Sequence, residues 1–201
     1  MEIEKFLECD VIVEEKVDGA NIGFSIGDDG LVRVQNRGGY LQYPFRGQFS
    51  KLNEWLNRSK FKIIECIDTN LIAFGEWSAA RHSIKYSNLP DYFLLFDVFD
   101  ITVDKFWSVE KRNVLAKKLQ FSTVPEIGRG KYTVNMLEDL LNSRSSHFVK
   151  GPLEGIVIRK DQSDWNIGRA KMVRREFTQA IEEHWSNRVM EWNEIDTGKN
   201  I

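Results

Sequence analysis

Apolar and β-branched residues gather in short runs along the chain, and turn residues separate these runs, a pattern that predicts strands. The strongest turn signal is Gly27-Asp-Asp-Gly30, which predicts a hairpin between the runs on either side of it. Together with the run before them, these two strands are expected to form a meander. The predicted strands are Val11–Glu15, Ala20–Ile26, Leu31–Gln35, Leu71–Glu76, Tyr92–Phe99, Gly155–Arg159 and Arg169–Val173.

Helical patterns interrupt the strands. Ser108 and Thr133 are residue types that favour helix N-caps, so helices are predicted from Ser108 to about Gln120 and from Thr133 through Leu141. Another helix is expected over Phe49–Leu56. The last helix is predicted from apolar residues at helical spacing, which are Phe177, Ala180, Ile181, His184, Trp185 and Val189.

The order of these elements indicates the fold class. Strands and helices mix without a regular β-α-β alternation, which favours an α+β domain with antiparallel sheets and flanking helices. No linker, repeat or low-complexity segment divides the chain. We therefore expect one domain over residues 1–201, in which residues 176–201 form a C-terminal helix.

The composition of the 201 residues, 42% apolar and 29% charged, is that of a soluble globular protein. No apolar stretch is long enough for a membrane span, and residues 1–10 lack the apolar region of a signal peptide. Cys9 and Cys66 form no Cys-x-x-Cys pair, which argues against structural zinc and favours a reducing, cytoplasmic compartment. With a net charge of −2, any contact with nucleic acid must come from local patches.

A lysine at the end of the first predicted strand is the most informative polar residue. Lys16 follows an apolar run and precedes Asp18 and Gly19, so its amine can face a pocket. A lysine amine attacks a phosphorus or carbonyl centre only after it loses its proton, which a neighbouring cation or metal promotes. Taken alone, this pattern favours a simpler interpretation, a surface strand that ends in an Asp-Gly turn.

Five further segments supply the other groups that covalent nucleotidyl transfer needs. Carboxylates can bind ribose hydroxyls and a metal, cations can absorb charge on phosphate oxygens, and an aromatic face can stack on a base. The segments are Arg33–Arg37, Phe74–Trp77, Phe93–Asp97, Glu154–Lys160 and Arg169–Arg175.

In this order the segments resemble the motifs of the covalent nucleotidyltransferase superfamily of ligases and capping enzymes. Within it the chain is most similar to the ATP-dependent RNA ligases related to the phage enzyme of the second type, and the similarity spans residues 11 to about 177. Lys16–Gly19 resembles motif I, Val34–Gly38 motif Ia, Phe74–Glu76 motif III, Phe93–Asp97 motif IIIa, Glu154–Arg159 motif IV, the Lys171 region motif V, and Val124–Lys131 the segment between motifs IIIa and IV.

The resemblance implies roles for individual residues. Lys16 would form a lysyl-AMP phosphoramide, Glu154 would work with the divalent metal, and Lys171 would hold the α-phosphate. The nucleotide would be bound by Glu15 at the adenine, Glu76 at the ribose, Phe96 by stacking on the adenine, and Arg37 with Asn21 at the triphosphate.

The resemblance also implies the reaction and its partners. ATP and Mg²⁺ or Mn²⁺ would be the cofactors, and the enzyme would join RNA ends that carry a 5′-phosphate and a 3′-hydroxyl, through a lysyl-AMP and an adenylated 5′ end. The nucleotide would lie in a groove between two sheets, without a C-terminal oligonucleotide-binding barrel. We expect a monomer with weak affinity for RNA of its own, hence a partner protein or a structured RNA for substrate delivery, and a viral or phage origin is compatible with the resemblance.

One position departs from the pattern of those ligases. Motif V carries two lysines two residues apart, and here the first falls on Lys171 but the second on Val173. Arg169 or Arg174 could reach a phosphate in its place, although an arginine is not equivalent to a lysine in geometry.

Several alternatives stay open at this point. Phe96 lies in an apolar run, where core packing is the default, and His82 and His184 are better explained as packing or capping residues than as ligands. A DNA nick ligase or a capping-type nucleotidyltransferase shares the motifs. A non-catalytic module that binds adenylate or RNA is the alternative from another functional class.

Overall fold

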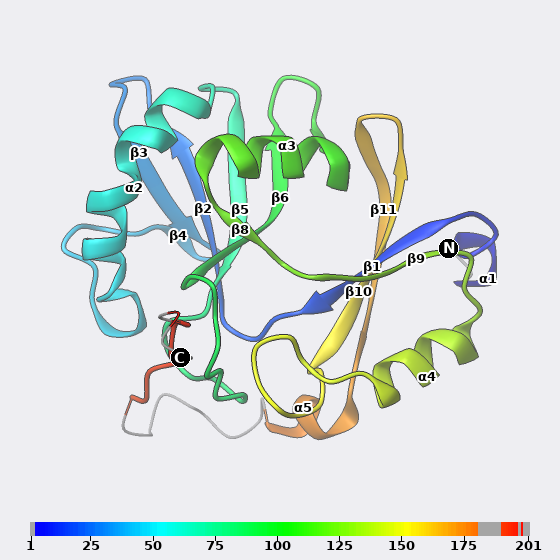
Figure 1. Cartoon of the computed structure of the whole chain (residues 1–201). Coiled ribbons are helices and arrows are strands. Elements are labelled where there is room, and N and C mark those ends of the chain that lie inside the picture. The colour runs from blue at the N-terminus through cyan, green and yellow to red at the C-terminus, as the bar shows by residue number, and fades with distance from the viewer. Residues whose placement is uncertain (1–2, 181–189, 197, 199–201) are drawn as a thin grey trace.

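The computed structural model describes residues 3–180, 190–196 and 198, which form two β-sheets that lie against each other (Figure 1). The larger sheet has the strand order β4-β3-β2-β5-β6-β7, with β8 paired to β6, and the smaller has the order β11-β10-β1-β9. The strands of the larger sheet are β2 (Ala20–Ile26), β3 (Val32–Asn36), β4 (Gly39–Tyr40), β5 (Leu71–Trp77), β6 (Phe93–Asp100), β7 (Lys105–Phe106) and β8 (Ser122–Thr123). Those of the smaller sheet are β1 (Val11–Lys16), β9 (Glu126–Gly130), β10 (Gly155–Gln162) and β11 (Trp165–Val173).

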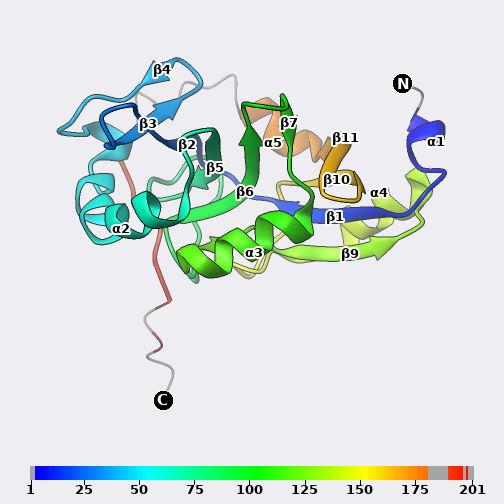
Figure 2. The same ribbon diagram turned by 90° about the horizontal axis from the view of Figure 1, so that it is seen from above.

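Helices cover one face of each sheet and bury apolar residues of its strands. The larger sheet packs on α2 and α3 through a core that includes Phe24, Trp55 and Leu115, and Figure 2 shows these helices on the same side of that sheet. The smaller sheet packs on α1 and α4 through Val13 and Leu137. The helices are α1 (Ile3–Phe6), the 3₁₀ turn η1 (Gly47–Phe49), α2 (Leu52–Cys66), α3 (Val109–Leu119), α4 (Val134–Ser143) and α5 (Arg175–Ala180).

The structure confirms the α+β class and most of the predicted elements. Within the described residues every strand pair is antiparallel except β6 with β8. The predicted caps are also confirmed, since Ser108 accepts a hydrogen bond from the Lys111 amide and Thr133 accepts one from the Met136 amide. No helix of the described part of the chain is long and apolar enough to cross a membrane.

The predicted meander is wrong in its first strand. β2 and β3 form the expected hairpin, in which Gly30 adopts φ +72°, a conformation that glycine adopts without strain. However, β1 does not pair with β2; it lies in the smaller sheet, between β9 and β10. The chain changes sheets immediately after Lys16.

Two helix predictions differ from the structure. The helix expected over 49–56 begins at Leu52 and continues to Cys66, past the exposed Phe61 and Ile64, which do not follow a buried stripe. The helix expected over 176–201 is described only as α5, and residues 181–189, including His184, lie outside the described residues. The segment 190–196 is not helical. It forms bridges from Trp192 to Ala80 and from Ile195 to Leu89.

Candidate active site

The amine of Lys16 lies at the point where the smaller sheet meets the larger one. Lys16 is the last residue of β1 and pairs in register with Gly155 of β10, next to Glu154. Its Nζ forms an ion pair of 2.5 Å with Glu154 Oε1. The other oxygen of Glu154 is buried without a hydrogen-bond partner. Burial raises the pKa of Glu154, and the charge of Lys16 opposes that shift.

Glycine at position 155 allows the strands to approach closely here. A Cβ on Gly155 would lie 2.5 Å from the Met172 carbonyl oxygen and 3.3 Å from Lys16 Cδ. Since real Cβ atoms do not come within 3 Å of backbone oxygens, a larger residue would push β11 away or move the lysine. The glycine in the Glu154-Gly155 pair therefore fixes where the amine stands.

The larger sheet contributes Asn21 and Glu76, which are register partners on β2 and β5. Burial raises the pKa of Glu76 to about 8, and the nearby carboxylates of Asp18 and Glu154 add to the rise. The charges of Lys16 and Arg37 act in the opposite direction, so these two cations lie close enough to Glu76 to affect it. Lys16, Asn21, Arg37 and Glu76 are thus brought together.

A β-bulge presents Phe96. Phe74 pairs with Asp97 and Gly75 with Leu95, so Phe96 has no partner on β5. A bulge changes the direction in which side chains point, and here Phe96 joins a small cluster with Val17 and Leu94 instead of the main core. The ring is partly exposed beside the residue that follows Lys16. This placement fits the predicted aromatic face, although the ring also packs as the simpler interpretation expected.

The cations of β11 and that of Arg174, which follows this strand, have different surroundings. Lys171 lies near enough to Glu154 for its charge to lower the pKa of that carboxyl. Arg169 instead donates a hydrogen bond to Asp97 Oδ2 and lies 4.0 Å over the Phe106 ring. Arg174 donates to the carbonyl of Leu141 at 2.7 Å. Neither arginine is therefore placed as a substitute for the lysine expected at Val173.

The sequence of the domain decides its family. The family model described as RNA ligase matches residues 10–173, most of the chain. This chain belongs to the RNA ligase family. A comparison with curated proteins finds no match.

Solved structures show the same fold. A Naegleria gruberi RNA ligase with PPi matches with a TM-score of 0.67 and 22% identity, over 90% of this chain and 54% of that one. A lysine-to-alanine variant of that ligase with ATP and Mn gives 0.65 and 18%, over 90% and 54%. A lysine-to-methionine variant with AMP and Mn gives 0.64 and 20%, over 89% and 53%. The chain spans about half the length of these proteins.

The Glu15 carboxylate is not brought to the Lys16 side of the sheet in this RNA ligase family member. Successive side chains of a strand point to opposite faces, and Glu15 is buried against the loop around Ser146 and His147. Its Oε1 accepts a hydrogen bond from Ser146 Oγ at 2.5 Å, and its Oε2 accepts one from the His147 amide at 3.0 Å. The predicted contact with adenine is thus not supported for this side chain.

The loop after β5 also contacts the site, which was not predicted from the sequence. Asp18 Oδ2 accepts hydrogen bonds from the amides of Ser83 (2.6 Å) and Ile84 (2.9 Å), which ties this loop to the residue two positions after Lys16. The aspartate of Lys-x-Asp-Gly was the available signal. His82 lies in the same loop, and its Nε2 is 2.8 Å from Gln48 Oε1. Burial lowers the pKa of His82; the charge of Asp18 opposes this effect, and that of Lys16 adds to it.

The site fits a divalent metal whose ligands would come mostly from the phosphates of a nucleotide and only in part from the protein. Among residues 3–180, 190–196 and 198, no group of three His, Cys, Asp or Glu side chains has a geometry that could hold a metal ion by itself. However, Mg²⁺ and Mn²⁺ at nucleotide sites commonly take one or two carboxylates besides phosphates and water. The unpaired, buried Glu154 Oε2 is an oxygen of that kind.

Proposed function

We propose that this chain is an ATP-dependent RNA ligase that works through a lysyl-AMP intermediate on Lys16. The observation that supports this most is the ion pair between the Lys16 amine and the buried Glu154, with Glu76 close by. A nucleophilic amine, a buried carboxylate and a carboxyl with raised pKa are the groups that nucleotidyl transfer needs in one place. The structures of the Naegleria gruberi ligase with ATP, AMP, PPi and Mn add support by analogy.

The chain's own residues would act in three steps. In the first, Lys16 attacks the α-phosphorus of ATP, forming a P–N bond and releasing pyrophosphate. In the second, the RNA 5′-phosphate oxygen attacks the same phosphorus, the P–N bond breaks, and a 5′-5′ pyrophosphate-linked end forms. In the third, the RNA 3′-hydroxyl attacks the 5′-phosphorus and AMP leaves. Positioning and charge neutralisation carry most of such phosphoryl chemistry.

Each group around the amine has a task in these steps. Lys171 would neutralise charge on the α-phosphate throughout. Glu76 would bind the ribose, and Asn21 would help to bind the phosphates. Arg37, on the exposed turn after β3, would contact the triphosphate and later the RNA end. A metal bound at Glu154 would supply further neutralisation of phosphate charge.

We also propose that the chain acts as a monomeric domain in the cytoplasm, and that a partner protein or a structured RNA supplies the ends. The first experiment incubates the protein with α-labelled ATP and Mg²⁺ and separates it on a denaturing gel. We expect a covalent label on the wild-type protein and none on Lys16→Ala. Lys118→Ala, which removes an exposed lysine in the last turn of α3, is the control and should label normally. Label on the Lys16 variant would contradict the proposal.

The same labelling assay, together with a joining assay on nicked substrates, separates the alternatives. Label from GTP instead of ATP would indicate a capping-type enzyme, and joining of all-DNA nicks would indicate a DNA ligase. A wild-type protein that binds ATP without covalent label would indicate a non-catalytic module.

A further inference from the structure

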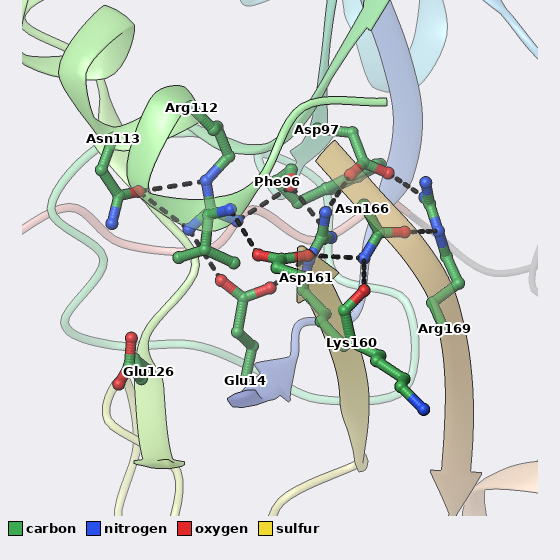
Figure 3. Close-up of polar contacts among 12 residues, drawn as sticks. Glu14, Phe96, Asp97, Arg112, Asn113, Glu126, Lys160, Asp161, Asn166 and Arg169 are labelled. Atoms are coloured by element: carbon green, nitrogen blue, oxygen red, sulfur yellow. Dashed lines mark hydrogen bonds and ion pairs between the residues drawn. The ribbon is translucent and has the colours of Figure 1, made fainter. Parts of the chain in front are cut away.

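Buried charged side chains form a chain of contacts across the junction between the two sheets (Figure 3). Its members come from four elements: Glu14 from β1, Asp97 from β6, Arg112 from the first turn of α3 and Arg159 from β10. Each of them is at most 2% exposed.

The two arginines meet at one backbone oxygen. Arg112 Nη1 donates to the carbonyl of Phe96 at 2.9 Å, and Arg159 Nη1 donates to the same oxygen at 3.2 Å. This carbonyl belongs to the bulged residue of β6. The bulge is thus held by two guanidinium groups in place of a strand partner.

The arginines are in turn held by two carboxylates. Arg112 Nη2 lies 2.7 Å from Glu14 Oε1, and Arg159 Nη2 donates to Asp97 Oδ1 at 2.6 Å. Glu14 stands two residues before Lys16 on the same strand, and its side chain therefore lies on the same face of the sheet as the amine. The network joins the strand of the nucleophile to the bulge of the aromatic ring.

Stability alone is a weak reason for such a network. Removing ions from water is costly, and buried ion pairs can often be replaced by apolar residues without loss of stability. Here burial raises the pKa of Glu14 despite the two neighbouring arginines. A positional role explains why charges that can hold a backbone oxygen are placed at the bulge.

We propose that Arg112 is a positioning residue that clamps β1 to the Phe96 bulge, and so sets the distance between the Lys16 amine and the ring that stacks on the base. This inference rests on the proposed nucleotidyl transfer. It concerns a residue on a helix outside all the motifs that the sequence resemblance identified.

The position of Arg112 on α3 is itself fixed. Ser108 caps the helix, and Asp161 of β10 accepts a hydrogen bond of 2.7 Å from the Val109 amide at the helix start. Arg112 follows within the first turn. Arg112 can form the ion pair with Glu14 while it donates to the Phe96 carbonyl and to Asn113 Oδ1, because its planar guanidinium carries separate N–H groups, whereas a lysine is a single point charge.

The first test measures the effect of Arg112 on the structure and does not depend on a reaction with ATP. We would compare Arg112→Lys with wild type by hydrogen–deuterium exchange and by thermal melting. We expect faster exchange in residues 94–98 and 13–17, with exchange in α2 unchanged. Exchange in residues 94–98 that equals wild type would overturn the clamp whether or not the chain reacts with ATP, while loss of labelling in wild type would overturn only the proposed function.

The second test asks whether Arg112 acts through the ring. In single-turnover lysyl-AMP formation, Arg112→Lys should raise the ATP concentration for half-maximal rate roughly tenfold, the effect of one lost charge-assisted hydrogen bond, and change the maximal rate little. In a Phe96→Ala background the same substitution should have almost no further effect, because coupled residues are not additive. Additive effects, or a change in the maximal rate alone, would contradict the positioning role.

Lys118→Arg is the control, because Lys118 is an exposed cation in the last turn of the same helix and lies outside the motifs. It should leave unchanged both the ATP concentration for half-maximal rate and the maximal rate. If Arg112→Lys does not fold, the double variant Glu14→Gln/Arg112→Gln, which removes both charges together, takes its place in the same cycle with Phe96→Ala and must show the same non-additivity.

Discussion

The smaller and the larger sheet bring different kinds of side chain to the site. From the smaller sheet and the turn before β10 come the charged groups Lys16, Glu154 and Lys171, and the charges of the two lysines oppose the rise that burial causes in the pKa of Glu154. From the larger sheet come Asn21 and Glu76, together with the Phe96 ring. Under the proposed function, the smaller sheet would carry the reaction at the α-phosphate, whereas the larger one would hold the nucleoside through Glu76 and Phe96 and would contact the triphosphate through Asn21 and Arg37. A reaction in this family member would depend on the distance between the two sheets as much as on either one.

The largest expected effect comes from a substitution among the residues predicted to act on the phosphates. Glu154→Gln keeps the shape of the side chain but removes the charge that pairs with Lys16 and the buried oxygen suited to a metal. We expect the maximal rate of lysyl-AMP formation to fall roughly 10²-fold or more, the scale of losing one electrostatic group at a reacting centre.

The matching change on the nucleoside side is Glu76→Gln. If the division between the sheets is correct, this variant raises the ATP concentration for half-maximal rate more than it lowers the maximal rate. Glu110→Gln, on the surface of α3, should behave like wild type. Equal effects of the Glu154 and Glu76 substitutions on the maximal rate would refute the division.

A second prediction concerns the loop after β5, which is hydrogen-bonded to Asp18 at the point where the chain passes from the smaller to the larger sheet. The buried side chain of Asn193 accepts a hydrogen bond from the Tyr86 amide at 2.8 Å and donates to the carbonyls of Ser78 (2.9 Å) and Ala80 (3.3 Å). Asn193→Ala leaves these groups unpaired, and we expect a loss of about 2–4 kcal/mol in the free energy of unfolding, since each unpaired buried group costs about 1–3 kcal/mol. Urea denaturation of Asn193→Ala and wild type measures this loss.

Glu194→Ala is the neighbouring control. Glu194 is exposed and holds Tyr86 and Leu89 only through its backbone. Its substitution should leave the free energy of unfolding near that of wild type. If both variants are equally destabilised, the segment matters through its backbone, and the Asn193 side chain does not hold the loop.

The sequence predicted the helices and strands better than it predicted which strands pair. Strand periodicity and helix caps are local signals, so β2, β5 and α3 were found close to their true bounds. Pairing is not local: β1 pairs with β9 and β10, which lie more than a hundred residues away in the chain. The short β9 was missed because its sequence, Glu-Ile-Gly-Arg-Gly, has weak strand propensity.

For the site, the motifs predicted which residues gather but not how they are held. Lys16, Glu154 and Glu76 were identified and are close together. The orientation of Glu15 toward Ser146 and the engagement of Arg169 by Asp97 depend on contacts between segments far apart in the sequence. Such contacts leave no pattern in a single sequence.

The smallest expected effect tests the environment of Glu76 by pH. Because its pKa is raised from 4.5 to about 8, the folded protein binds a proton between these values that the unfolded chain does not, so Glu76 lowers the free energy of unfolding as pH rises through this window. Glu76→Gln cannot ionise. We therefore expect this variant to gain stability relative to wild type between pH 5 and pH 9, by about 1.4 kcal/mol for each unit of pKa shift that the partly exposed side chain retains. Asp29→Asn should show no pH-dependent change in this window, since hydrogen bonds from the Leu31 amide and Arg33 lower the pKa of Asp29 from 3.8, and this carboxyl is therefore ionised in the folded and the unfolded chain above pH 5. Urea denaturation at both pH values decides, and a difference between Glu76→Gln and wild type that does not change with pH would mean that Glu76 is solvated like a surface carboxylate.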